Sequence, residues 1–329
     1  MRLKKSLQLI VNNACDKKCK YCYENNIGDK SLTIDNVDNV IEKFINTDIW
    51  NRHILFFGGE PTLSLPVLRD AFNKHHDDVT FSIITNGYFL NLVDYDFMKN
   101  YSSVSVSLEG TEESYAFFRN GSNLRNVIDR LIALKWNNII INISINGLLN
   151  HNIKEFVSNV RYILNNGLHV HLYSLKGDDF FKDLEEYIHF LKNVKNEDED
   201  IFNMIILKDG NTSDTPFLCT FDDAISISPD NKIVKCARLN EEWITYDQLD
   251  DVKEEWANII AHNHKDLYEG CSNCEVEIGK CQTSCPALIK ELIQSSNFDL
   301  LNKLCMRERI NEKLRRGEWV LWYKRIKEL

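Results

Sequence analysis

The chain has 329 residues, of which 43% are hydrophobic, and its 39 basic and 49 acidic side chains give a net charge of −10. This length accommodates one large or two modest domains, and the apolar fraction is sufficient for a full core. The acidic balance argues against nucleic acid as the main partner, because such binding neutralises phosphates with Lys and Arg. No signal segment or bilayer-spanning apolar run is present, so we expect a cytoplasmic protein without a membrane partner.

Strand-like and helix-like stretches alternate from residue 6 to about residue 175. Strands are predicted at residues 6–11, 53–57, 79–84, 104–108, 139–145 and 169–175. Helices are predicted from residue 33 and at residues 66–75, 92–100, 124–134 and 153–166. Six β–α units in series indicate a parallel sheet with right-handed crossovers, two units short of a closed barrel. Polar and glycine-rich residues follow the strands, at the edge where barrel-type enzymes place their chemistry.

Three cysteines follow the first predicted strand directly: Cys15, Cys19 and Cys22. Ten cysteines in a chain without a secretion signal indicate metal or redox chemistry. Three thiols this close cannot all pair as disulfides, but they can all bind one metal cluster. A cubane iron–sulfur cluster has four irons, so three thiolates leave one iron open for another ligand. A zinc site completed by a fourth ligand is the alternative, although no His follows closely.

The cysteine spacing resembles the signature of the radical S-adenosylmethionine (SAM) superfamily. Matching motifs follow the later strands, with Glu109-Gly110 where family members often have Asp-Gly. The resemblance implies that a [4Fe–4S] cluster with an open iron binds SAM. Glu60 would suit the SAM ammonium, Arg119 or Ser107 would suit its carboxylate, and the glycines would let the backbone approach the ligand. The implied SAM-binding residues are Tyr21, Gly58, Gly59, Glu60, Thr85, Asn86, Ser105, Ser107, Arg119 and Asn142.

The pattern changes after about residue 177. A helix is predicted at residues 180–194, an acidic turn at 196–200, a strand at 202–208 and a linker at 209–216. Residues 224–228 and 233–235 predict a β-hairpin with Cys219 and Cys236 at its feet. Residues 243–246 and a helix near 252–263 lead to further cysteines. These are Cys271, Cys274, Cys281 and Cys285, with Cys305 after another helix.

The second group of cysteines resembles the SPASM extension of radical SAM enzymes, which carries two auxiliary [4Fe–4S] clusters. Two departures are visible: the spacing from Cys274 to Cys281 is one residue longer, and Asn231 stands where the family has a glycine. By resemblance, Cys271, Cys274, Cys281 and Cys305 would hold the outer cluster. Cys219, Cys236 and Cys285 would hold the inner one, whose fourth iron we expect to be open or bound by a non-cysteine ligand. A pair of zinc knuckles at residues 271–285 is the alternative reading.

The predicted architecture is α/β. Residues 1–176 would form a partial (β/α)6 TIM-type barrel, and residues 177–216 a bridging segment. Residues 217–310 would form a small Cys-rich α+β SPASM domain with a β-hairpin, and residues 311–329 a C-terminal helix.

The radical SAM enzymes with a SPASM extension that this chain resembles mostly modify peptides or proteins. We therefore expect a maturase that installs a thioether, ether or carbon–carbon crosslink in a ribosomally made precursor peptide. Formylglycine formation, as in anaerobic sulfatase maturation, or another side-chain oxidation is the alternative, although Ala237 stands where that subgroup has an Asp base. A non-catalytic zinc-binding protein is the alternative from another class. The sequence selects no catalytic base.

The expected partners are a peptide or protein substrate and a reductant such as flavodoxin or ferredoxin. Fourteen residues precede Cys15, so we expect no N-terminal leader-recognition domain. We therefore expect the substrate to dock directly or to be presented by a separate leader-peptide recognition protein.

Overall fold

The structure is a computed structural model that describes residues 5–22, 28–46, 50–174, 181–207, 224–234, 242–245, 295–296 and 298–315. The chain divides into two compact units. The first comprises Met1–Ile143, Tyr162–His171 and Thr220–Ala261, and the second comprises Ser144–Arg161, Leu172–Cys219 and His262–Leu329. Within the described ranges, no helix is both long and apolar enough to cross a membrane.

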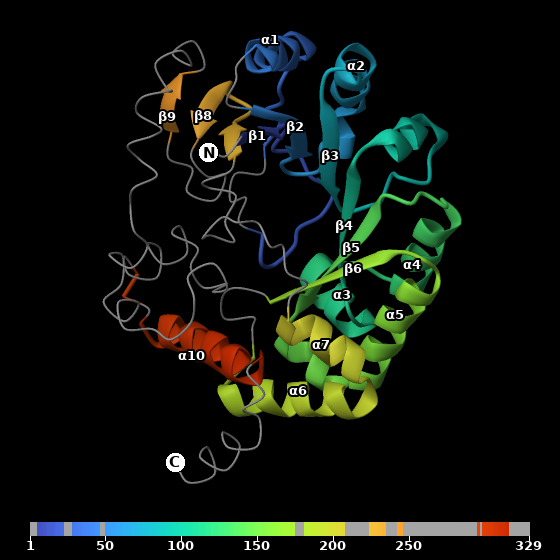
Figure 1. The fold of residues 1–329 in the computed structure, drawn as a ribbon, viewed down its shortest axis with the longest axis vertical. Helices are drawn as coiled ribbons and strands as arrows, with labels where there is room; N and C mark the ends of the chain where they lie inside the picture. Colours follow the sequence, from blue (N-terminus) through green and yellow to red (C-terminus); the bar gives the residue numbers. More distant parts are fainter. Residues whose placement is uncertain are drawn as a thin grey trace. The chain divides into compact units, whose positions relative to one another are not determined.

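A nine-stranded sheet contains the six predicted β–α strands (Figure 1). These are β1 (Lys5–Ile10), β2 (Trp50–Phe57), β3 (Thr80–Thr85), β4 (Ser103–Glu109), β5 (Ile139–Ile145) and β6 (His169–Ser174). The spatial order is β6-β5-β4-β3-β2-β1-β7-β8-β9, so the first six strands are neighbours in chain order. The pairs β1–β2, β2–β3 and β3–β4 are parallel. The predicted α/β fold with a partial barrel is therefore confirmed.

Helices connect these strands and cover one side of the sheet. They are α1 (Ile34–Ile45), α2 (Leu65–His75), α3 (Glu112–Arg119), α4 (Leu124–Ala133) and α5 (Ile153–Asn165), with 3-10 turns η1 (Pro61–Ser64), η2 (Val93–Asn100) and η3 (Gly147–His151). Thr33 caps α1 as expected, because its side chain accepts a hydrogen bond from the Asn36 backbone N–H. Helices α1, α2 and α4 lie along the outer side of the curved sheet (Figure 1).

Helix α3 is a feature that the sequence reading missed. It begins after Thr111, whose hydroxyl accepts from the Ser114 backbone N–H in a capping box. It ends at Asn120, which adopts a left-handed conformation with φ of 50°. Only eight residues separate these caps, which is too few for a clear helical periodicity, so the caps were the available signal.

The three strands that complete the sheet are β7 (Ala224–Ile227), β8 (Lys232–Val234) and β9 (Glu242–Thr245). The predicted hairpin is confirmed, since β7 and β8 pair antiparallel and Asn231 in its turn has a φ of +59°. β7 also pairs in parallel with β1, and the Ser226 hydroxyl donates to Gln8 Oε1 at 3.0 Å. The hairpin therefore extends the barrel sheet at the free edge of its first strand.

The second unit contains a helical cluster of α6 (Leu184–Glu197), α7 (Glu199–Leu207) and α10 (Phe298–Arg315). The prediction of a strand at residues 202–208 was wrong, because residues 202–207 belong to α7. Asp198 caps this helix by accepting from the Ile201 N–H at 3.1 Å, and Arg161 binds the same carboxylate. Ile201, Phe202, Ile205 and Ile206 are buried at helical spacing. A short apolar run without clear periodicity fits either a strand or a helix. Here the Asp198 cap and the burial of apolar side chains at helical spacing favour the helix.

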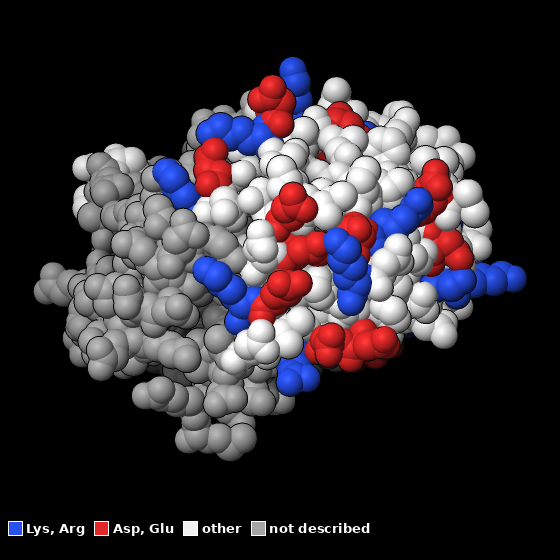
Figure 2. Space-filling model, turned by 90° about the horizontal axis from the view of Figure 1, so that it is seen from above, with Lys and Arg blue, Asp and Glu red and all other residues white. Residues whose placement is uncertain are grey.

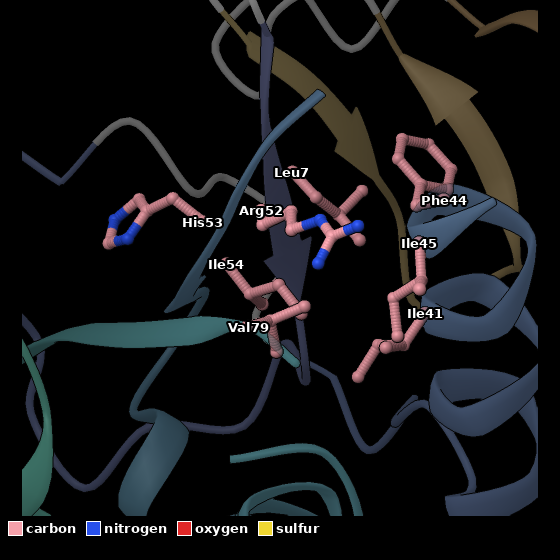
Figure 3. Close-up of a pocket in the computed structure, with 8 residues that line it drawn as sticks. All are labelled: Leu7, Ile41, Phe44, Ile45, Arg52, His53, Ile54 and Val79. Atoms are coloured by element: carbon pink, nitrogen blue, oxygen red, sulfur yellow. The ribbon is translucent and has the colours of Figure 1, made fainter. Parts of the chain in front are cut away.

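The two faces of the sheet differ in polarity. Leu7 and Ile54 point towards α1 and help to line a cavity on the helix side (Figure 3). Because side chains alternate along a strand, Ser105 and Ser107 of β4 lie on the opposite face, where they are half-buried. Asn142 of β5 is also half-buried, between buried isoleucines. A closed barrel fills this face with bulky apolar side chains, whereas here polar groups remain accessible to a ligand.

The cavity on the helix side lies at the amino-terminal ends of the first strands. Its residues are Leu7, Ile41, Phe44, Ile45, Arg52, His53, Ile54 and Val79. In Figure 3 Arg52 extends towards α1, whereas His53 points away from the other side chains. The volume is ≈ 10 Å³, about the room for one water molecule. This cavity is therefore too small for a cofactor or a peptide.

Charged side chains of both signs are interspersed over the described part of the face in Figure 2. Ion pairs also form within helices of the described chain, such as Lys74 with Asp70 at 2.9 Å and Arg125 with Asp129 at 3.3 Å. Exposed pairs of this kind contribute about 0.2–0.5 kcal/mol each. The described part of this face therefore carries no extended surface of a single charge.

Candidate functional site

The three-cysteine segment leaves β1 alongside the segment that leaves β2. The Gly59 N–H donates to the Asn12 carbonyl at 2.8 Å, and the Glu60 N–H donates to the Ala14 carbonyl at 2.7 Å. These bonds continue the parallel pairing beyond the strands, up to the residue before Cys15. The first cysteine is therefore positioned by the sheet itself.

Gly58 and Gly59 allow this close approach. A Cβ at Gly58 would lie 2.4 Å from the Asn12 carbonyl oxygen, and one at Gly59 would lie 2.2 Å from that of Ala14. Gly58 also has a φ of +142°, which side chains disfavour. The sequence reading attributed these glycines to a bound ligand, whereas the structure shows that they bring two chain segments together.

Glu60 connects the ends of β2 and β3. Its side chain is buried, and its Oε1 accepts from the Thr62 N–H at 3.1 Å, the Thr62 hydroxyl and the Thr85 hydroxyl at 2.6 Å. Its Oε2 accepts from the Asn86 N–H at 2.7 Å. Burial raises the pKa of Glu60, and these hydrogen bonds partly oppose that effect. Three predicted cofactor residues, Glu60, Thr85 and Asn86, are thus brought into one network.

Asn12 and Asp16 extend the network, and the sequence did not reveal them. Asn86 Nδ2 donates to Asp16 Oδ1 at 2.6 Å, which joins the β3 edge to the cysteine segment. The buried Asn12 donates to the Glu60 carbonyl at 3.0 Å and to the Ser64 hydroxyl at 2.7 Å. These residues carry no recognisable spacing, so only their tertiary contacts identify them.

The three cysteines lie on one loop, and none of them forms a disulfide. Cys15 and Cys19 are half-buried and Cys22 is exposed. Burial raises the pKa of Cys15 to about 11, although the Lys17 N–H donates to its sulfur at 3.4 Å. Burial also raises the pKa of Cys19. A metal ion offsets this effect, because a coordinated thiol is deprotonated.

The donor set of this loop, three thiols, fits an iron–sulfur cluster. Among the described residues, no three His, Cys, Asp or Glu side chains converge on one metal position. A cubane cluster does not need such convergence, because each thiolate binds a different iron. The loop offers three sulfurs and Arg119 lies beside one of them, with its Nη1 3.9 Å from Cys19 Sγ.

Arg119 and Tyr21 meet at a buried carboxylate, that of Glu109. Arg119 Nε donates to Glu109 Oε1 at 2.9 Å, and the Tyr21 hydroxyl donates to the same oxygen. The Glu109 side chain has no exposed area, and that of Arg119 is 7% exposed. The sequence reading noted Glu109 only as a departure from the Asp-Gly pattern, and the structure makes it the junction between β4, α3 and the cysteine loop.

The second group of cysteines lies largely outside the described residues. This holds for Cys219, Cys236, Cys271, Cys274, Cys281 and Cys285. Cys305 is half-buried within α10, and the segment before it, where a helix was expected, lies largely outside the described residues. The auxiliary clusters therefore stay a prediction.

Comparison with protein families agrees with this site. Residues 9–163 match the family described as the Radical SAM superfamily. That range contains all three cysteines of the loop and every strand edge described above. The matched segment, a little under half of the chain, is therefore that of a radical SAM domain, whose cofactors are a [4Fe–4S] cluster and SAM.

Individual relatives are similar in sequence to part of this chain. The radical SAM cyclopropyl synthase TigE of Paramaledivibacter caminithermalis is 29% identical over 178 residues, which are 47% of this chain and 37% of TigE. The chain thus matches little more than a third of that relative's length. A cysteine-type anaerobic sulfatase-maturating enzyme of Clostridium novyi is 28% identical over 147 residues, 39% of each protein.

Solved structures share the fold over most of the chain. The structure of anSMEcpe with bound AdoMet has a TM-score of 0.61 at 15% identity and covers 90% of this chain and 99% of its own. Streptococcus suis SuiB bound to S-adenosylmethionine has a TM-score of 0.62 at 15% identity, covering 89% and 75%. Both proteins also have structures with peptides, Cp18Cys for anSMEcpe and the precursor peptide SuiA for SuiB.

Proposed function

We propose that this chain cleaves SAM reductively and uses the resulting radical to modify a peptide. The specific modification that we propose is a crosslink in a ribosomally made precursor peptide. The observation that carries the proposal is the cysteine loop at the carboxyl edge of β1. The segments after β2, β3 and β4 are hydrogen-bonded to that loop or to one another at the same edge.

Cys15, Cys19 and Cys22 would hold the cluster through three irons and leave the fourth for SAM. When bound and reduced, the cluster and SAM supply a 5′-deoxyadenosyl radical that abstracts a hydrogen atom from the substrate. The protein's own contribution is to bind, orient and shield these groups.

Glu60 is suited to the SAM ammonium group. Three of its four hydrogen bonds go to Oε1, so Oε2 keeps capacity for a further donor beside the Asn86 N–H. A buried carboxylate gains more from a cation than an exposed one does, because the surrounding medium screens less. Ser107 would donate to the SAM carboxylate from the polar face of the sheet.

The remaining predicted cofactor residues would shape the same pocket. Ser105 and Asn142 lie on the half-buried polar face with Ser107. Ile84 pairs with Ser105 and is exposed on the same face, which leaves an apolar surface for the adenosine or for the substrate.

The peptide substrate is proposed from the relatives. SuiB and anSMEcpe have been solved with peptides, and TigE is a cyclopropyl synthase. We further propose that the cysteines of residues 219–305 bind two auxiliary [4Fe–4S] clusters, with an open or non-cysteine-ligated iron in the inner one. A flavodoxin or ferredoxin would supply the electron, and a separate recognition protein would present the leader peptide.

Anaerobic reconstitution of the full chain tests this function. We expect about twelve irons per chain, from three cubane clusters, and dithionite-dependent conversion of SAM to 5′-deoxyadenosine. With candidate precursor peptides, mass spectrometry should find a product lighter by two hydrogens, and fragmentation should locate a crosslink. Zinc without SAM cleavage would instead identify a zinc-binding protein.

Formylglycine formation is the second candidate, since one relative is a cysteine-type sulfatase-maturating enzyme. The same assay with a sulfatase-derived Cys peptide separates the two functions. Loss of sulfur from the Cys and a new aldehyde that reacts with a hydrazide would favour this candidate. Ala237, at the position of the expected base, argues against it.

A further inference from the structure

The cysteine loop is tethered to the last turn of α3. The Lys20 N–H donates to the Phe118 carbonyl at 2.9 Å, and the Tyr21 and Phe118 rings lie 5.5 Å apart. Arg119, the next residue of the helix, directs Nη1 at Cys19 Sγ from 3.9 Å. Three consecutive residues of the loop, Cys19 to Tyr21, thus contact two consecutive residues of one helix.

Glu109 fixes the direction of this guanidinium. Its Oε1 accepts from Arg119 Nε at 2.9 Å and from the Tyr21 hydroxyl. Two charges removed from water are stable only with well-formed hydrogen bonds to each other, so the pair has little freedom to rearrange. Arg119 is therefore anchored through Nε, while Nη1 faces the sulfur.

The Arg119 guanidinium faces Cys19 directly. Its Nη1 lies 3.9 Å from Cys19 Sγ, whereas Glu109 binds the same guanidinium at Nε. The positive partner of the ion pair is therefore the group that contacts this sulfur. Hydrogen bonds to cluster sulfurs and nearby charge are among the factors that set the reduction potential of an iron–sulfur cluster.

We propose that Glu109 and Arg119 are positioning residues that hold the cysteine loop on α3 and raise the reduction potential of the cluster through the N–H donated to Cys19. The inference rests on the proposed function only in that the three thiolates bind the cluster. It differs from the expectation that Arg119 binds the SAM carboxylate, because its Nε and Nη1 face protein groups. The physical reason is that a reduced cluster carries one more negative charge, which a fixed cation stabilises.

An EPR-monitored redox titration of the reconstituted full chain, without SAM, tests the electrostatic part. The relevant signal is the one that SAM addition changes. Arg119→Met keeps the side chain's bulk but removes charge and donors. We expect it to lower the reduction potential by about 59 mV, which corresponds to a tenfold change for a one-electron couple. Arg125→Met, at an exposed arginine of α4, is the matched control and should leave the potential unchanged.

Hydrogen exchange in the cluster-free protein tests the positioning part. Glu109→Gln and Arg119→Met should speed amide exchange in residues 19–22 at least tenfold, whereas Arg125→Met should not. If Arg119→Met does not retain the cluster, its reduction potential cannot be measured, and the exchange rates then test the proposal. Unchanged exchange in residues 19–22 would overturn it.

The expectation of a SAM-carboxylate role makes a different prediction. An unchanged potential in Arg119→Met, together with weaker SAM binding, would overturn the proposal. A wild-type chain that never cleaves SAM would refute the proposed function, yet the shift in potential and the exchange rates would still support this inference. The two failures are therefore distinguishable.

Discussion

At the scale of single residues, backbone contacts determine where the first cysteine lies. Gly58 and Gly59 have no side chains because carbonyl oxygens of the cysteine segment occupy that space. A methyl group at either position would push the two segments apart, since real Cβ atoms essentially never lie within 3.0 Å of such an oxygen. Cluster binding should therefore be sensitive to these glycines even though they are not ligands.

Gly59→Ala is expected to lose the cluster of the cysteine loop, which is about four irons per chain. Iron analysis after reconstitution measures this loss. Gly167→Ala is a useful control, because Gly167 has a φ of +81° with open space around it. That variant should cost about 1–2 kcal/mol of stability from backbone strain and keep its iron. Equal iron contents in the two variants would contradict the steric explanation.

Glu60 should make stability depend on pH. Its pKa in the folded protein is raised above the ordinary value of 4.5 by burial, so the folded state holds the proton more tightly than the unfolded state. Stability from this group is fully present below pH 4.5 and is lost as pH rises through the raised folded pKa. Urea unfolding at a series of pH values from 4.5 upwards should show that the free energy of unfolding of the wild type falls relative to that of Glu60→Gln.

The size of that effect is about 1.4 kcal/mol for each unit of pKa shift. Glu185→Gln, on the exposed side of α6, serves as the control and should give a curve parallel to wild type. If the wild-type and Glu60→Gln curves are also parallel, the carboxylate is stabilised fully by its four donors and the assigned direction is wrong.

At the scale of elements, α3 connects the sheet to the cysteine loop. Its position depends on the Thr111 cap at one end and on contacts of its last turn at the other. Because the helix has only eight residues, fraying at its start reaches its last turn easily. We therefore expect the cap of α3 to influence the cluster from a distance.

Thr111→Ala and Thr33→Ala form a matched pair, since each residue caps a helix through a capping box. Each should lower the free energy of unfolding by about 0.5–2 kcal/mol. Only Thr111→Ala of this pair should also speed the loss of iron to a chelator, because the described contacts join α3, and not α1, to residues 19–21 of the cysteine loop. Equal rates of iron loss would show that the tether does not depend on helix integrity.

At the scale of the whole molecule, two groups of cysteines are separated by about 200 residues of sequence. The first lies on a loop that the sheet positions, so its cluster should be independent of the second group. Replacing Cys15, Cys19 and Cys22 with Ala should abolish SAM cleavage and remove about four of about twelve irons.

Cys271→Ala is the complementary variant. It should lose iron from the outer auxiliary cluster and keep some SAM cleavage that is uncoupled from peptide modification. Production of 5′-deoxyadenosine by the triple variant would contradict the assignment of the SAM site.

Much of the site followed from sequence because its signals are local or ordered along the chain. Three thiols within eight residues indicate a cluster whatever the fold around them. Motifs after successive parallel strands must meet at one edge, which correctly grouped Glu60, Thr85 and Asn86. The hairpin turn at Asn231 also followed from its own conformational preference.

Only the tertiary structure decided how these parts hold one another. The pairing of Glu109 with Arg119 and Tyr21, and the need for glycine opposite Ala14, join residues that are 10 to 88 positions apart. The segment at residues 199–207 became a helix because Asp198 caps it and its apolar side chains are buried at helical spacing. Spacing along the chain indicates local geometry and strand order. The hydrogen-bond partner of a side chain depends instead on which polar groups are buried beside it and must be satisfied by protein rather than by water.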